Sequence, residues 1–172
     1  MKAARYHLPH EGNVPGQLRV DDVPVRVPAA DEVRVRVGFA GICGSDLARY
    51  RQLPGEPRAL FALLGDPSPI PGHEISGIVE SIGEGVPETW DDGVPVLGSR
   101  VVVHPQIGCG ECDSCRAGYW TGCSRPECIR LIGLHRDGAF AEYVNAPFDH
   151  LVRLPDALSL RDAALAEPVA VA

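Results

Sequence analysis

Four cysteines lie close together in one short stretch and constrain the fold more than any other feature of this chain. Their spacing is C-x2-C-x2-C-x7-C. Each two-residue gap allows a tight turn to bring two sulfurs to one centre, and the longer gap allows the chain to return with the fourth. Four thiolates around one ion make a closed tetrahedral zinc site, which holds a lobe together and performs no chemistry. The predicted ligands are Cys109, Cys112, Cys115 and Cys123.

The use of cysteine also indicates the compartment. The N-terminal residues MKAARYHLPHEG contain no apolar segment of the kind found in secretory signals. Six cysteines without such a signal favour metal binding over disulfides, so we expect a cytoplasmic protein. The sixth cysteine, Cys128, could replace Cys123 as a ligand, although a free thiol is the simpler interpretation.

Composition and charge exclude two classes of partner. The chain has 172 residues, a net charge of -7 and no run of Lys and Arg, whereas a nucleic-acid surface needs a basic patch. The longest purely apolar stretch, residues 59–64, is far too short to span a bilayer. We therefore expect neither a nucleic-acid nor a membrane partner, and a homo-oligomer remains possible.

Hydrophobic residues mostly follow the two-residue period of strands. Val23, Val25 and Val27 alternate with other residues, and so do Val33, Val35 and Val37, which predicts two half-buried strands. Further strands are predicted at residues 75–82, 100–103, 140–144 and 151–154. With 19 Gly and 16 Pro as turn formers, the first 155 residues predict a mainly β domain, a distorted barrel or sandwich with short helices.

The pattern changes near residue 159. Ser159 and Asp162 resemble a helix capping box, with Asp in place of the usual Glu. Pro168 is expected to push Glu167 towards an extended conformation and to suit the first turn of a new helix. The sequence stops four residues later, so we expect residues 158–172 to begin a connection to a further domain.

A second set of candidate metal ligands comes from three separated segments. Cys43, His73 and Glu167 supply one sulfur, one nitrogen and one oxygen. A catalytic zinc typically takes three protein ligands and leaves one position open. Glu74 follows His73 directly and could be an additional or alternating ligand. Each residue alone is more often structural, but their occurrence beside a four-cysteine lobe favours a catalytic metal site.

At this point the chain resembles the N-terminal catalytic domain of the zinc-dependent medium-chain alcohol dehydrogenases. The motifs that carry the resemblance are GICGSD (41–46), PGHEISGIVESIG (71–83), GCGECDSCRAGYWTGC (108–123), DGAFAEYV (137–144) and AEPVAVA (166–172). The Glu-Pro pair in the last motif is similar to the polyol, sugar and threonine dehydrogenase branch. The resemblance implies a GroES-like β-barrel over residues 1–157, with a structural-zinc lobe at about 104–128.

The resemblance also implies roles for individual residues. Cys43, His73 and Glu167, with Glu74 close by, match the ligands of the catalytic zinc. Ser45 matches the hydroxyl that passes on the substrate proton, and Asp46 matches a carboxylate that orients a ligating histidine. The four clustered cysteines match the structural zinc site. Some members carry a histidine five residues after the first ligand, and because Ala48 stands there, the proton exit must differ and is expected through water or through Glu74 as a catalytic residue.

The implied reaction is zinc-assisted hydride transfer from an alcohol, polyol, sugar or amino alcohol to NAD or NADP. The sequence contains no G-x-G-x-x-G dinucleotide fingerprint, so we expect the chain to be the metal-carrying half of a dehydrogenase and inactive by itself. We also expect the catalytic zinc to be weak, absent or held without Glu167, because Glu167 lies near the chain end, while the four-cysteine site stays full.

Four other interpretations compete with this one. The alternatives are a stand-alone GroES-like zinc-binding module without catalysis, a co-chaperonin-like module, a zinc-ribbon interaction module and a zinc hydrolase. A co-chaperonin needs neither cysteine set, a ribbon uses well-separated C-x2-C pairs, and no H-E-x-x-H motif supports a hydrolase. Residues 50–70 could line a substrate cleft with Tyr50 and Phe61, or could pack a short helix into the core.

Overall fold

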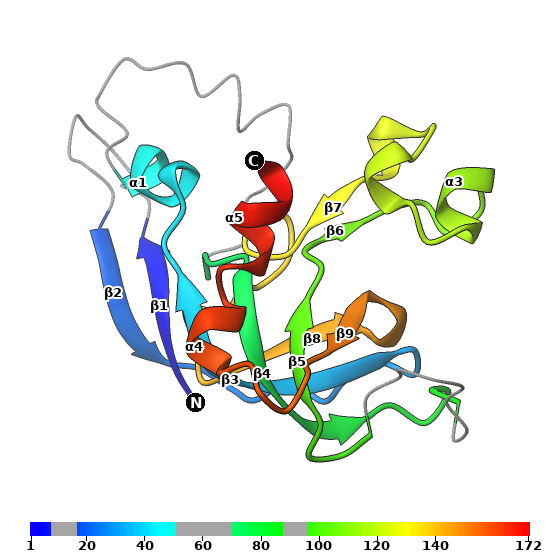
Figure 1. The fold of residues 1–172 in the computed structure, drawn as a ribbon. Coiled ribbons are helices and arrows are strands. Elements are labelled where there is room, and N and C mark those ends of the chain that lie inside the picture. Colours follow the sequence, from blue (N-terminus) through cyan, green and yellow to red (C-terminus); the bar gives the residue numbers. More distant parts are fainter. Residues whose placement is uncertain (8–16, 51–69, 88–95) are drawn as a thin grey trace.

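The computed structural model describes residues 1–7, 17–50, 70–87 and 96–172, which form a mainly β chain with short helices (Figure 1). The fold class expected from the sequence is thereby confirmed. The strands are β1 (Lys2–His7), β2 (Gln17–Asp22), β3 (Glu32–Gly41), β4 (Glu74–Ile82), β5 (Arg100–Val103), β6 (Gln106–Ile107), β7 (Arg130–Leu131), β8 (Tyr143–Pro147) and β9 (Leu151–Arg153). The helices are α1 (Gly44–Tyr50), α3 (Asp113–Arg116), α4 (Leu160–Ala163) and α5 (Ala166–Val171), with 3-10 turns η1 (Trp120–Gly122), η2 (Pro126–Cys128) and η3 (Phe148–His150).

The central sheet has five strands in the order β8-β3-β4-β5-β9, and all of its described pairs are antiparallel. β3 shows register shifts between Arg34 and Val35 and between Val37 and Phe39, where bulges bend the strand. Two further pairs, β1-β2 and β6-β7, lie outside this sheet. The sheet places the ends of β3, β4 and β5 side by side, and these ends carry the residues of the site.

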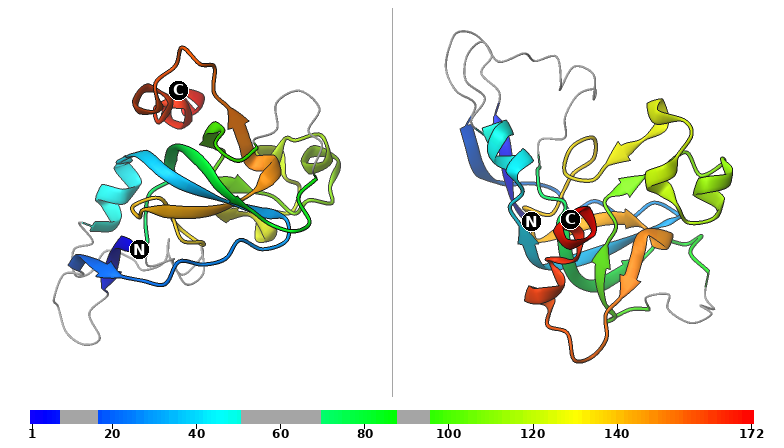
Figure 2. Two further views of the ribbon diagram at one scale, coloured as in Figure 1. Left: turned by 90° about the horizontal axis from the view of Figure 1, so that it is seen from below. Right: turned by 45° about the horizontal axis from the view of Figure 1, so that its top comes forward.

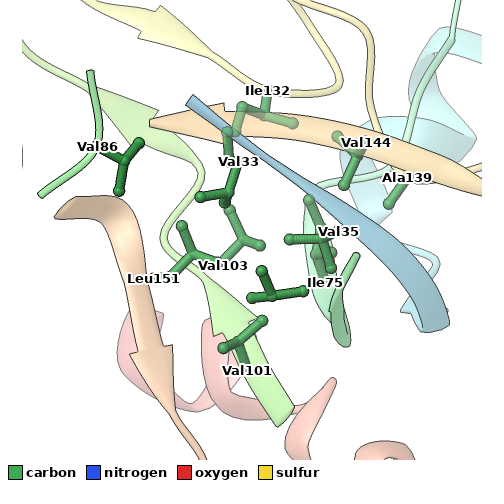
Figure 3. Packing of buried hydrophobic residues seen from close by; sticks show 12 residues of the cluster. Val33, Val35, Ile75, Val86, Val101, Val103, Ile132, Ala139, Val144 and Leu151 are labelled. Atoms are coloured by element: carbon green, nitrogen blue, oxygen red, sulfur yellow. The ribbon is translucent and has the colours of Figure 1, made fainter. Parts of the chain in front are cut away.

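The core lies on one face of the central sheet (Figure 3). Val33 and Val35 of β3 and Val101 of β5 are completely buried, because alternate residues of a strand point to the same face. The buried cluster consists of Val33, Val35, Ile75, Val79, Val86, Val101, Val103, Ile132, Ala139, Val144, Ala146 and Leu151. It contains no residue of the four-cysteine stretch.

The four-cysteine lobe projects from the sheet on the side away from β1 and β2 (Figures 1 and 2). It contains β6, α3, η1 and η2, and the short β6-β7 pair marks its connection to the barrel. α4 and α5 both pack against β4, which brings the C-terminal residues close to the start of that strand. Among the described residues, no helix is long and apolar enough to cross a membrane.

Two of the predicted strands need correction. Residues 23–27 follow β2 and are not a strand, and Val25 and Val27 are exposed. Pro24 and Pro28 interrupt this segment and cannot donate backbone hydrogen bonds to a ladder. The strand predicted at 140–144 begins later, at Tyr143, because Phe140 bonds through its N–H to Pro71 in a turn. The other predicted strands are confirmed.

The Ser159 half of the predicted capping box is confirmed, and the predicted conformation of Glu167 is wrong. The Ser159 hydroxyl accepts a hydrogen bond from the Asp162 N–H at 3.1 Å and caps α4. Glu167 lies inside α5 and not in an extended segment. Pro168 is the third residue of α5, where a backbone N–H has no intrahelical acceptor, so proline does not interrupt the helix there.

Candidate functional site

Three side chains meet beside α1, where β3 ends and β4 begins. Cys43 directly precedes α1, and His73 and Glu74 stand at the start of β4. Their candidate ligand atoms, one sulfur, one nitrogen and one oxygen, all lie within 4.8 Å of one another. Cys43 and His73 are half-buried and Glu74 is buried. This donor set suits a zinc ion with a further position open, and the structure thus brings together three of the four predicted ligands.

Gly41 makes room for the Glu74 carboxylate. Gly41 is the last residue of β3 and pairs with Glu74. A methyl group on Gly41 would lie 1.7 Å from Oε2 of Glu74, so the carboxylate fills the space that any other residue would use. The absence of a side chain at Gly41 therefore directs Glu74 toward Cys43 and His73.

The turn before His73 is fixed by backbone contacts. Gly72 has a φ of 98°, a conformation that favours glycine. The Ala139 N–H donates to the Gly72 carbonyl at 3.0 Å, and the Phe140 N–H donates to the Pro71 carbonyl at 2.9 Å. These bonds hold the Pro-Gly-His turn on the loop before β8, which positions the His73 imidazole.

α1 orients the cysteine end of the site. The Cys43 N–H donates to the Asp46 carboxylate at 3.0 Å, and Asp46 is almost fully buried. The Tyr6 hydroxyl donates to the Asp46 carbonyl at 2.9 Å, which ties α1 to β1. Ser45 is exposed in the first turn of α1, two residues after Cys43. Asp46 therefore fixes the backbone of Cys43, and the Ser45 hydroxyl remains accessible.

The environment of Glu74 favours an added cation. Burial raises the pKa of Glu74, and the carboxylates of Glu167 and Asp46 raise it further. The His73 imidazole and a hydrogen bond with the Cys43 thiol act in the opposite direction. A divalent cation among these groups would stabilise the ionised carboxylate, because it would be the largest local charge.

Glu167, the fourth predicted ligand, lies near this set but does not join it. It sits on α5, which packs against β4, and it interacts electrostatically with both Glu74 and His104. It is not one of the residues whose ligand atoms lie within 4.8 Å of one another. Coordination by Glu167 therefore stays a prediction, and Glu74 occupies the position of the oxygen donor in the observed group.

The four predicted cysteines of the lobe also come together. The ligand atoms of Cys109, Cys112, Cys115 and Cys123 lie within 4.8 Å of one another. The Cys109 and Cys115 sulfurs are 3.9 Å apart, and none of the six cysteines forms a disulfide. Gly108 allows this approach, because a methyl group there would lie 2.4 Å from the Cys115 sulfur. Cys128 on η2 is not part of the group.

The surroundings of the lobe shift the pKa values of its thiols in opposite directions. Backbone hydrogen bonds at Ser124 and Cys115 lower the pKa of Cys112 to about 5. Burial raises the pKa of Cys115 to about 12, with neighbouring thiols contributing. A metal ion needs all four as thiolates, so the backbone N–H groups prepare one ligand while the ion must ionise another.

Sequence reasoning missed a second cluster close to the site. His104, Trp120 and His150 stack beside the ends of β5 and β9. No motif marks the two histidines, which are far apart in the chain, while Trp120 lies within the cysteine motif at 108–123. The only available signal was positional, since His104 follows the predicted strand 100–103.

Of the predicted cleft walls, Tyr50 is described and exposed, and Phe61 lies outside the described residues.

Comparison with known proteins now defines the class. A model of the family described as "Alcohol dehydrogenase GroES-like domain" matches residues 29–156. The chain belongs to this family of GroES-like domains of alcohol dehydrogenases.

Individual relatives agree with this class. The sorbitol dehydrogenase of Bacillus subtilis is 34% identical over 171 residues, which are 99% of this chain and 43% of that protein. The structure of the "short chain alcohol dehydrogenase (rspB)" of Escherichia coli CFT073 with NADH is similar, with a TM-score of 0.70, 31% identity and coverage of 98% of this chain and 42% of that chain. A cobalt- and zinc-bound alcohol dehydrogenase of Pyrobaculum aerophilum has a TM-score of 0.71, 29% identity and coverage of 96% and 44%. The chain thus spans about two fifths of the length of these proteins.

Proposed function

We propose that this chain is the metal- and substrate-binding part of a zinc-dependent, NAD(P)-dependent dehydrogenase. The substrate is a secondary alcohol of the polyol, sugar or amino-alcohol class. The observation that carries the proposal is the meeting of Cys43, His73 and Glu74 at one end of the sheet. The sorbitol dehydrogenase relative supports the polyol class, and the NADH- and zinc-bound structures support the cofactors.

The residues of the site would have separate roles in metal binding, proton transfer and positioning. Cys43, His73 and Glu74 would hold a zinc ion, which when bound acts as a Lewis acid and lowers the pKa of an alcohol hydroxyl. Ser45 would accept the hydroxyl proton, since its own hydroxyl is exposed next to the ligand turn. Asp46 keeps Cys43 in place through its hydrogen bond to the backbone. Glu167 would approach from α5 as an alternating ligand or as a second carboxylate.

The four-cysteine lobe would hold a second, structural zinc. Its donor set is closed, because four sulfurs complete a tetrahedron and leave no position for substrate. The proposal keeps the predicted division of the chain into a catalytic domain over residues 1–157 and a connecting segment over residues 158–172. It places the complete enzyme in the cytoplasm, without nucleic-acid or membrane partners and as a possible homo-oligomer.

Metal analysis tests the donor sets directly. We expect one tightly held zinc ion and one weaker site that fills on titration with Zn²⁺ or Co²⁺. Cys43→Ser should remove the weaker site and leave the tight one, whereas Cys115→Ser should do the opposite. Loss of both ions in the Cys43 variant, with the fold retained, would contradict the two-site assignment.

Activity requires a dinucleotide-binding partner, because the sequence has no nucleotide fingerprint. Fusing the chain to the remaining part of the Bacillus subtilis sorbitol dehydrogenase supplies one. We expect NAD(P)H formation with polyols in the fusion, and loss of it in the His73→Ala fusion. A folded, zinc-loaded fusion that is inactive on alcohols, polyols and sugars would favour the zinc-binding module without catalysis.

A further inference from the structure

A row of ionisable side chains crosses the central sheet at the metal-binding end. β4 and β5 pair with Ile75 opposite Val103, so the preceding Glu74 and the following His104 lie at the next level of the ladder. β5 and β9 pair with Val103 opposite Leu151, and the His104 N–H donates to the His150 carbonyl at 2.8 Å. Glu74, His104 and His150 therefore stand on three neighbouring strand ends.

The two ring nitrogens of His150, whose side chain is 4% exposed, have different surroundings. Its Nδ1 lies 2.7 Å from Oδ1 of Asp149, whose side chain is 51% exposed. The hydrogen bond from His150 lowers the pKa of Asp149, so this carboxyl is ionised at neutral pH and can only accept. Nδ1 therefore carries the proton, and Nε2 carries a lone pair.

The other ring nitrogen of His150, Nε2, has no hydrogen-bond partner among the described residues. Nε2 is fully covered and forms no hydrogen bond within the part of the chain that the structure describes. The ring stacks on Trp120 with centroids 4.0 Å apart, which holds the imidazole plane in place. A buried acceptor without a partner is costly, and such groups in native proteins are usually explained by an ordered water or a functional role.

His104, the neighbouring imidazole, has the same tautomer as His150. Its Nδ1 lies 3.1 Å from the Gln106 carbonyl, which only accepts, so its Nε2 also carries the lone pair. The two imidazole centroids are 6.0 Å apart, and His104 interacts electrostatically with Glu167 on α5. Burial lowers the pKa of His104, which keeps this imidazole neutral beside His150.

A carboxylate on Nδ1 and a free lone pair on Nε2 are the parts of a general base. The carboxylate fixes the tautomer and stabilises the imidazolium that forms when Nε2 takes a proton. The groups that face His150 are Asp149 on η3, His104 after β5 and the neutral Trp120 of η1, and Glu167 of α5 lies beyond His104.

We propose that the Asp149–His150 pair is the base that takes up the proton released at the metal centre, through a water held between Nε2 of His104 and Nε2 of His150. This inference rests on the proposed function and names the proton acceptor of the same site. It gives the proton a destination although Ala48 stands at the position of the family's relay histidine.

The proton balance is simple. The O–H bond of the substrate breaks, Ser45 or Glu74 passes the proton to the water, and the water passes a proton to Nε2 of His150. Asp149 stays ionised beside the imidazolium and accepts no proton. After the product leaves, Nε2 gives the proton back to the water, which releases it to bulk solvent through the emptied substrate site, so His150 regains its starting tautomer and one proton is released per turnover.

The first test measures the tautomer in the 172-residue, zinc-loaded chain. Long-range ¹H–¹⁵N NMR should show His150 protonated at Nδ1 and unprotonated at Nε2 at neutral pH. Asp149→Asn should reverse this tautomer, because an amide can donate to Nδ1, and the matched control Asp156→Asn should not. Asp156 is exposed in the loop that follows β9. Protonation of Nε2 in the unsubstituted chain would overturn the proposal.

The second test measures turnover in the fusion with the sorbitol dehydrogenase part. We expect His150→Gln to lower kcat about 10- to 100-fold with little change in KM, to remove a basic limb from the kcat–pH profile and to respond to added imidazole. A kcat within twofold of the Asp156→Asn control would overturn the proposal. An inactive unsubstituted fusion would count against the proposed function instead. The NMR measurement of the His150 tautomer would then be the test of the Asp149–His150 proposal.

Discussion

Gly41 is a single position on which the geometry of the metal site depends. Its missing side chain leaves the space that the Glu74 carboxylate fills. We predict that Gly41→Ala displaces Glu74 and lowers zinc affinity at the Cys43 site by about 10- to 100-fold, the range seen when a group that orients a ligand is changed. The measurement is competitive Zn²⁺ titration with a chromogenic chelator.

Gly44 provides the matched control for this substitution. A methyl group on Gly44, three residues further along, would meet nothing within 4 Å. Gly44→Ala should therefore bind zinc like the unsubstituted chain, and both variants should keep the tighter four-cysteine zinc. Equal affinities in Gly41→Ala and Gly44→Ala would show that Glu74 does not contribute to binding.

His104 makes the stability of the chain depend on pH. Burial is the main cause that lowers its pKa in the folded chain, below the value of about 6.5 in an unfolded one. As pH falls through 6.5, the unfolded chain therefore binds a proton before the folded chain does. The stabilisation is complete above that pH and is lost below it, at no more than about 1.4 kcal/mol per pH unit for one proton.

We predict that His104→Gln removes this dependence. Urea unfolding of both chains between about pH 7.5 and 5.5 should show a smaller fall in the free energy of unfolding for the variant. Any loss of zinc at low pH affects both chains and cancels in the comparison. If the free energy of unfolding falls equally with pH in both chains, His104 is not the source of the pH dependence.

Among the elements, α4 is short and depends on its cap. A helix of this length cannot support itself, so the bonds at its start carry much of its stability. The Ser159 hydroxyl accepts from Asp162, and the Ser76 hydroxyl of β4 donates to the Leu160 carbonyl at 2.5 Å. α4 in turn leads directly into α5 and Glu167.

We predict that Ser159→Ala lowers the free energy of unfolding by about 1 kcal/mol. Ser159→Asp should restore most of it, because an aspartate oxygen can also cap the helix. Thermal unfolding of the three chains measures the effect. If the alanine and aspartate variants unfold alike, the cap does not stabilise α4.

The elements also show what sequence reasoning could predict. The strands at 75–82 and 100–103 were predicted correctly, because each is a short buried run beside a turn. The alternation of Val23 and Val27 was misleading, since exposed valines between prolines have the same period. Glu167 was misassigned because the rule for residues before proline gives way in the first turn of a helix.

The two metal-binding groups also differ in how far the sequence alone predicts them. The cysteine spacing alone predicted the lobe, because its ligands are close in sequence. Cys43 and His73 were candidate ligands by residue type, but the resemblance was needed to assign them to one site, since only the pairing of β3 with β4 brings them together. The imidazole pair was not found, because His104 and His150 meet through the pairing of β5 with β9 and carry no motif.

For the whole molecule, the distribution of buried residues indicates two parts, of which only one has a hydrophobic core that can stabilise it without a metal ion. The fully buried residues of the hydrophobic cluster come mostly from β3, β4, β5, β8 and β9, and of the lobe at 104–128 the partly buried Ile107 packs against them. Within the described chain, Cys115 is the buried hydrophobic residue of that lobe. The lobe therefore depends on its metal ion, whereas the barrel has a core of its own.

We predict that Cys115→Ser releases the structural zinc and unfolds the lobe while the central sheet remains folded. Hydrogen exchange should show lost protection of the α3 and η1 amides and retained protection in β3 and β4, because only the lobe relies on the ion. Cys128→Ser is the matched control, since Cys128 lies outside the ligand group, and it should change neither zinc content nor protection. If the Cys128 substitution alone releases zinc, the ligand assignment is wrong. If β3 and β4 lose protection together with α3, the barrel does not hold its fold without the lobe, and the two parts form one cooperative unit.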